Sequence, residues 1–154
     1  MDRTRLLGGC LACAMLALSA CGGGSPRAPL SKSELAAKVN AACTSYVKAS
    51  TAVPQPGDFT SNAASAAAYL DKLKPLVESE HAAIVGLKPV PELRPRFEQF
   101  RAASSHQVEL FESALAKAHA KNPGGLRDLA AAARYKQTVL VPLERELAFT
   151  ACER

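Results

Sequence analysis

The longest amphipathic segment of the chain spans residues 93–118 and reads LRPRFEQFRAASSHQVELFESALAKA. Its apolar and small side chains recur every three or four residues, at Leu93, Phe97, Phe100, Ser104, Val108, Phe111, Leu115 and Ala118. This spacing is typical of one face of an α-helix. Pro95 falls in the expected first turn, where its missing N–H costs little. A helix with such a face needs partner helices to bury it, so the segment predicts a helical bundle.

Three other segments can supply the partner helices. Ser31-Lys32-Ser33-Glu34 has the form of a capping box and predicts a helix from residue 31 that ends before the proline-rich residues 53–57. A second helix is expected over residues 62–87, and a fourth after the turn at residues 122–125, extending to Leu147. Pro75 and Pro142 lie inside these two helices and predict kinks. The expected core positions are Leu35, Val39, Ala42, Cys43, Tyr46, Val47, Ala66, Leu70, Leu73, Val77, His81, Ile84, Leu126, Leu129, Ala133, Leu140, Leu143 and Leu147.

The fold class follows from these four segments and the short connections between them. No stretch alternates with a period of two for long enough to predict a sheet. Short connections favour antiparallel neighbours. Residues 31–154 are therefore predicted to form one all-α domain, an antiparallel four-helix bundle with Pro-kinked helices and one disulfide.

The first twenty residues predict a lipoprotein signal peptide. Arg3 and Arg5 precede an uncharged run over residues 6–18, which is too short to span a bilayer. The run ends in Leu18-Ser19-Ala20-Cys21, which resembles the lipobox of bacterial lipoproteins. We expect cleavage after residue 20 and a lipid on Cys21. The alternative is an ordinary secretory signal followed by an incidental cysteine.

Residues 21–30 are rich in Gly and Pro and predict a flexible tether between the lipid and the folded domain. The expected location is the extracytoplasmic face of a cell membrane, which is the periplasmic side if the source is Gram-negative. Without residues 1–20 the formal net charge is +4, with acids interspersed among the bases. Because the domain is expected to be exported, this charge does not indicate a nucleic-acid partner.

The chain has five cysteines, and the signal peptide and lipid account for three of them. Cys43 and Cys152 remain, and export would place them in an oxidising compartment. We therefore predict a Cys43–Cys152 disulfide, which stabilises the domain by about 4–5 kcal/mol in the chain-entropy model. The alternative is two free or metal-bound thiols.

One feature of this pairing fits the bundle badly. The end of the fourth helix should lie beside the start of the first, yet Cys43 is about 18 Å along the first helix from Ser31. Either the first turns of that helix overhang the bundle, or the chain after Leu147 folds back. The sequence interpretation favours the overhang, because a tethered helix start need not be packed.

The mature region resembles a group of small uncharacterised helical lipoproteins from high-GC, mainly actinobacterial, bacteria. The resemblance covers most of residues 40–152. It rests on Ala42-Cys43, residues 68–77, Glu80-His81, residues 87–93 and Cys152. It implies a secreted helical fold with one disulfide. It implies no activity, ligand or catalytic residue.

Two polar patterns are candidates for a site. Glu78-x-x-His81 is one copy of a motif that di-iron bundles use twice, together with a Glu from each of the other two helices. The simpler interpretation is a partly buried, hydrogen-bonded histidine. Lys136 falls on the apolar stripe of the fourth helix and could join His81 and Ser104 in a pocket between helices. The alternative for Lys136 is an ammonium that reaches water along the helix surface.

No serine, threonine or cysteine stands in a recognisable frame with a histidine and an acid, so the sequence predicts no enzyme and no cofactor. The leading hypothesis is a non-catalytic module that binds another envelope protein or a cell-wall polymer. The alternative is a carrier of a small ligand or metal. A carrier needs a cavity lined by polar groups near His81, Ser104 and Lys136, whereas a module needs an exposed apolar patch larger than a few hundred Å².

Overall fold

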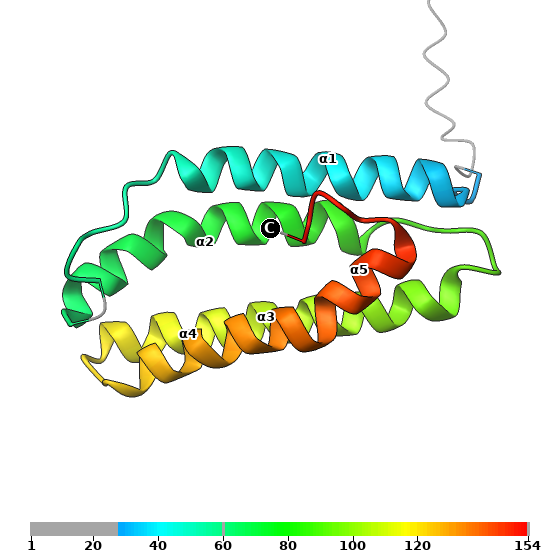
Figure 1. The fold of residues 1–154 in the computed structure, drawn as a ribbon. Helices are drawn as coiled ribbons and strands as arrows, with labels where there is room; N and C mark the ends of the chain where they lie inside the picture. The colour runs from blue at the N-terminus through cyan, green and yellow to red at the C-terminus, as the bar shows by residue number, and fades with distance from the viewer. Residues whose placement is uncertain (1–27, 60, 154) are drawn as a thin grey trace, which may run out of the picture.

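The computed structural model of the protein describes residues 28–59 and 61–153, and within them the fold is all-helical. Three long helices come first, α1 (Lys32–Thr51), α2 (Ala63–Val85) and α3 (Arg94–His119). The fourth is divided into α4 (Gly124–Tyr135), a π-helical turn η1 (Lys136–Leu140) and α5 (Val141–Leu147). In Figure 1, α1 lies along α2, and the segments from α3 to α5 lie below them. The predicted signal peptide and Cys21 lie outside the described residues.

Side-chain caps fix where the first two helices begin. The Glu34 N–H donates to Ser31 Oγ over 3.4 Å, and the Ser31 N–H donates to Glu34 Oε2 over 2.9 Å, so the predicted capping box is present. Asn62 Oδ1 accepts from the Ala64 N–H over 3.0 Å and caps α2 in the same way. These bonds satisfy N–H groups that have no partner inside their helices.

The larger core lies around the disulfide. Phe97, Phe149, Leu35 and Val39 are its most deeply buried large side chains. The rings of Phe100 and Phe149 meet edge to face with centroids 5.0 Å apart. Burial of each such side chain contributes about 1.5–3 kcal/mol, so this cluster is the main source of stability.

A smaller core joins α2 to α3 at the other end of the molecule. It consists of Ala66, Ala67, Leu70, Leu115 and Ala118. Small side chains let helices approach closely. The helices α4 and α3 also approach closely, because a Cβ on Gly125 would lie 2.9 Å from the Ala114 carbonyl oxygen.

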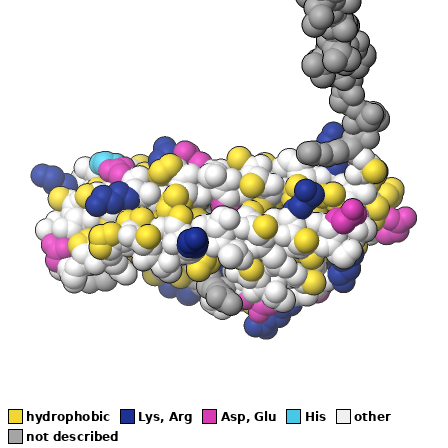
Figure 2. Space-filling model, turned by 90° about the horizontal axis from the view of Figure 1, so that it is seen from above, with side chains coloured by type: hydrophobic (Ala, Val, Ile, Leu, Met, Phe, Trp, Pro, Cys, Tyr) yellow, Lys and Arg dark blue, Asp and Glu magenta, His cyan; other side chains and the backbone are white. Residues whose placement is uncertain are grey.

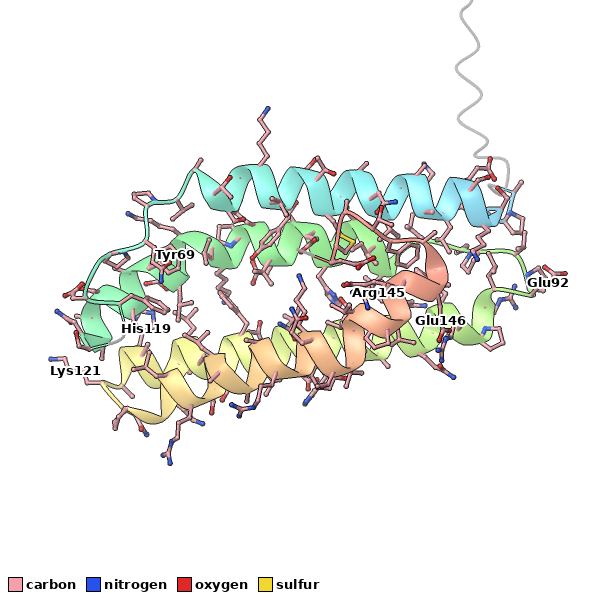
Figure 3. All side chains as sticks on the ribbon, in the orientation of Figure 1. Tyr69, Glu92, His119, Lys121, Arg145 and Glu146 are labelled. Carbon is pink, nitrogen blue, oxygen red and sulfur yellow. A yellow bond between two sulfur atoms is a disulfide. The ribbon has the colours of Figure 1, made fainter. Side chains whose placement is uncertain are left out.

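The predicted Cys43–Cys152 disulfide is present, with 5.2 Å between the two Cα atoms, and is the yellow bond in Figure 3. The predicted overhang of the first helix is wrong. Leu35 and Val39 in its first turns are 1% and 0% exposed. The chain after Leu147 folds back instead, because Phe149 must enter the core.

Two features hold this reversal. Ala148 has a φ of 63°, which ends α5 in the left-handed conformation, and the Phe149 N–H donates to the Glu144 carbonyl over 2.7 Å. The side chain of Asn40 then binds the returning chain twice. Its amide N–H donates to the Ala148 carbonyl over 3.0 Å, and its Oδ1 accepts from the Ala151 N–H over 2.9 Å.

The two internal prolines have different surroundings. Pro75 is exposed, and α2 continues through it from Ala63 to Val85. Pro142 follows η1, in which the Val141 N–H donates to the Lys136 carbonyl, five residues back. A proline ring clashes with the carbonyl four residues before it. That carbonyl belongs to Thr138, which lies inside η1, so the fourth helix departs from α-helical geometry directly before this proline.

Leu30, the last residue of the predicted tether, is held by the folded domain. Its N–H donates to the Lys88 carbonyl over 2.8 Å, and its carbonyl accepts from the Val90 N–H over 2.9 Å. Leu30 is thereby fixed to the loop between α2 and α3. None of the described helices combines the length and the apolar character that a membrane span needs.

Candidate ligand-binding cavity

A cavity of about 190 Å³ lies between the helices, next to the disulfide. Its polar lining comes from α1, α2, α3, η1 and α5 and consists of Tyr46, Glu80, His81, Ser104, Gln107, Lys136 and Glu144. The remaining wall is apolar and includes Val77, Ile84, Phe100, Leu140 and the two half-cystines. The volume equals that of about six water molecules, so only a small molecule fits inside.

The structure brings together His81, Ser104 and Lys136, as the pocket hypothesis requires, since all three line this one cavity. His81 Nδ1 is 3.3 Å from Ser104 Oγ, and its Nε2 is 3.4 Å from the hydroxyl of Ser105. Lys136 occupies the first position of η1 and is half-buried. The π turn therefore places the ammonium group among the polar residues of α2 and α3.

Two carboxylates of the cavity were not among the predicted site residues. Glu144 is only 3% exposed, and its Oε2 has no hydrogen-bond partner within the described residues. Gln107 Oε1 is likewise buried and unpartnered within them. Glu80 lines the same cavity from α2. Two acceptor oxygens are thus buried without a donor, which is costly unless something else in the cavity supplies one.

A spacing signal for these acids exists in the sequence. Glu80 stands three residues after Val77 and four before Ile84, and Glu144 stands four after Leu140 and three before Leu147. Both acids therefore lie within the apolar stripes of their helices.

Burial dominates the ionisation of these acids. It raises the pKa of Glu80 to about 7, an effect that the Lys136 ammonium opposes and the Glu144 carboxylate reinforces. The pKa of Glu144 is also raised by burial, again opposed by Lys136 and reinforced by Glu153. The pKa of the Tyr46 hydroxyl is raised by burial and by Glu80. Glu80 thus exchanges its proton near neutral pH, and a positive charge in the cavity would favour its ionised form.

The Glu78-x-x-His81 pattern does not converge on a metal position. Glu78 is 52% exposed and lies 3.6 Å from the Lys74 ammonium, whereas His81 faces the cavity. Among the residues that the structure describes, no group of three or more His, Cys, Asp and Glu side chains is arranged to hold a metal ion.

The other two histidines lie outside the cavity. His106 is exposed, contacts Glu109 over 3.1 Å, and has its ring centroid 4.8 Å from that of Tyr135. His119 is in the last turn of α3, 3.0 Å from Asp71, and its label in Figure 3 lies at the end of the molecule near Tyr69. The pairs His106–Glu109 and His119–Asp71 lie on the surface.

Comparison of the chain with models of known protein families, with curated proteins and with solved structures found no match in any of the three. No relative therefore indicates a function, and the clearest functional feature of the described residues is the cavity.

Proposed function

We propose that this chain is a lipid-anchored extracytoplasmic protein whose helical domain binds a small ligand between its helices, without catalysis. The anchor part rests on the sequence of residues 1–21, and the short connections favour an antiparallel order of the four helices. The binding part rests chiefly on one observation, the unpartnered buried oxygens of Glu144 and Gln107 that line the cavity. Buried acceptors are normally satisfied. A ligand in the cavity would satisfy them.

The surroundings of His81 support binding rather than hydrolysis. A nucleophilic triad needs a histidine with a hydroxyl on one ring nitrogen and a carboxylate on the other. The hydrogen bonds described for His81 go to two hydroxyls, those of Ser104 and Ser105. Such an arrangement orients the ring as part of a polar wall.

The face of the molecule in Figure 2 favours the carrier over the interaction module. A module would need a large continuous apolar patch. On the face in Figure 2, hydrophobic side chains occur in small groups, mixed with charged side chains of both signs and with other groups. The cavity, in contrast, has the polar lining that a carrier requires. An envelope partner that docks on this face would meet charged and other polar groups between the small apolar groups.

Binding can be tested by thermal denaturation of the full chain, purified oxidised in detergent, with a panel of small metabolites and metal ions. A ligand that binds only the folded state adds about 2.7 kcal/mol at a hundred times its Kd. We expect a saturable rise in melting temperature that Lys136→Met changes and Glu78→Gln, on the exposed side of α2, leaves unchanged. A flat response across the panel, equal in all three proteins, would contradict the proposal.

The anchor can be tested separately by labelling cells with a radioactive fatty acid. The wild-type chain should carry label and sediment with membranes, and Cys21→Ala should do neither. Label that persists in Cys21→Ala would exclude Cys21 as the lipidated residue.

A further inference from the structure

We propose that the ligand of this cavity is a small primary ammonium compound, whose N–H groups bind Glu144 and Gln107 and whose carbon chain lies along the apolar wall. This inference rests on the proposed binding function and specifies the chemical class of the ligand. Four properties of the cavity lead to it.

The first property is charge. With Glu80 and Glu144 ionised, the cavity holds two carboxylates and one ammonium, that of Lys136. The other titratable groups that face it are Tyr46 from α1 and His81 from α2, while α3 contributes the neutral Ser104 and Gln107. The negative charge of Glu153 also acts on Glu144. Arg145 Nε lies 2.9 Å from Glu153 Oε2 and partly balances that charge. A single positive charge on the ligand would balance the excess.

The second property is the kind of hydrogen bond that the cavity can form with a ligand. The two unpartnered buried atoms, Glu144 Oε2 and Gln107 Oε1, are both acceptors. They require a ligand that donates. A primary ammonium group carries three N–H donors and no acceptor, whereas a quaternary ammonium group carries the same charge with no donor.

The third property is size. About 190 Å³ equals about six water molecules, so a ligand of about five or six non-hydrogen atoms fills the cavity.

The fourth property is the apolar part of the wall, where Ile84, Phe100 and Leu140 suit a short alkyl chain. An amine of this length would place its charged end at the acids and its carbons against these side chains.

Isothermal titration of the full chain, oxidised and in detergent, tests the proposal with four probes of matched size. They are n-butylamine, 1-butanol, tetramethylammonium and butyrate, each measured against protein-free micelles at about pH 8.5. That pH is above the pKa of about 7 that Glu80 has in the folded protein, and butylamine is still protonated. We expect butylamine to bind at least tenfold more tightly than each of the other three.

Two variants locate the site. Glu144→Gln keeps the shape of the side chain and removes its charge, and we expect it to weaken butylamine at least tenfold. Glu146→Gln, also on α5 but 53% exposed and paired with Arg96, is the matched control and should bind as the wild type does. Glu80→Gln serves as a second cavity variant if Glu144→Gln fails to fold, as judged by circular dichroism.

The other outcomes overturn the inference in distinguishable ways. Binding of butanol or butyrate as tight as that of butylamine would refute the ammonium class and leave the binding function standing. Equal binding of tetramethylammonium would refute the need for N–H donors. Butylamine binding unchanged in both cavity variants would refute the site. No binding of any probe, with the metabolite panel also flat, would refute the binding function itself.

Discussion

Raising the pH should destabilise the folded domain through Glu80. Burial raises the pKa of this carboxyl group from its ordinary value of 4.5 to about 7, so the folded state holds the proton more tightly than the unfolded state does. The stability is fully present below about pH 4.5 and is lost as the pH rises through about 7. At 1.36 kcal/mol per pKa unit, the whole loss is about 3 kcal/mol, of which about 2.5 kcal/mol falls between about pH 5 and about pH 8.5.

This pH window distinguishes Glu80 from acids whose pKa is lowered in the folded protein. Hydrogen bonds from Ser31 lower the pKa of Glu34, and hydrogen bonds from Lys117 and then Ser113 lower the pKa of Asp128. Those groups stabilise the folded state above their ordinary pKa values, and this contribution is lost as the pH falls through their lowered values. The change in their contribution with pH is therefore confined to acidic conditions below the window. Glu144 acts in the same direction as Glu80, so a variant is needed to separate the two.

Urea denaturation followed by circular dichroism at about pH 5 and about pH 8.5 measures the effect. With a urea dependence of about 2 kcal/mol per molar, the wild-type midpoint should fall by more than about 1 M between the two conditions. Glu80→Gln should lose most of this difference, because its side chain does not titrate. Glu78→Gln, on the exposed side of the same helix, should keep it. If Glu80→Gln shows the same pH dependence as the wild type, the assignment of the proton to buried Glu80 is refuted.

Three further predictions concern the scaffold around the cavity. Reduction of Cys43–Cys152, which lie 109 residues apart, should cost about 5 kcal/mol in urea denaturation, and an unchanged midpoint would show that the disulfide does not constrain the unfolded chain. Phe149→Ala should cost about 3–5 kcal/mol because its ring is fully buried, whereas a cost below about 1 kcal/mol would mean that the returning C-terminal segment is not docked. Gly125→Ala should cost about 1–3 kcal/mol because its Cβ meets the Ala114 carbonyl. Gly57→Ala, in open space, should be near neutral in the same urea denaturation.

Much of the scaffold could be predicted from helical spacing alone. The stripes assigned to the first three helices are buried or half-buried at every position, and the capping box at Ser31 begins α1 as expected. The disulfide followed from the count of cysteines that export leaves available. These features depend on local sequence and on a period of 3.6 residues, which a single chain displays directly.

The fourth helix shows where this reasoning fails. The sequence placed Ala133 in the core, whereas the structure buries Ala132 and exposes Ala133. The π turn at Lys136–Leu140 inserts one residue, so positions before it are shifted by one relative to Leu140. Helical projection at a constant period cannot represent such a shift. From the sequence, Pro142 predicts a kink but not an inserted residue.

The sequence predicts only part of the candidate site, because helical spacing does not show tertiary packing. His81, Ser104 and Lys136 were grouped because each interrupts an apolar stripe, and the structure places them on one cavity. Glu80 and Glu144 were missed, although they too lie within stripes, because charged residues at the edge of a stripe are usually solvated. Their burial depends on the depth of the space between helices, which comes from tertiary packing. The fold-back after Leu147 likewise depends on a long-range contact, between Phe149 and the rings of Phe97 and Phe100.

The most direct test of ligand binding in the cavity uses Ile84, the only isoleucine of the chain. Because the chain has one isoleucine, a label on the isoleucine δ1 methyl group gives a single NMR resonance. The side chain is 3% exposed and lines the cavity, so this resonance reports on the interior of the cavity. We predict that n-butylamine shifts the Ile84 resonance saturably in the wild type and in Glu146→Gln, and that the shift is lost in Glu144→Gln. A resonance that stays in place at saturating amine, or that moves equally in Glu144→Gln, would contradict the account.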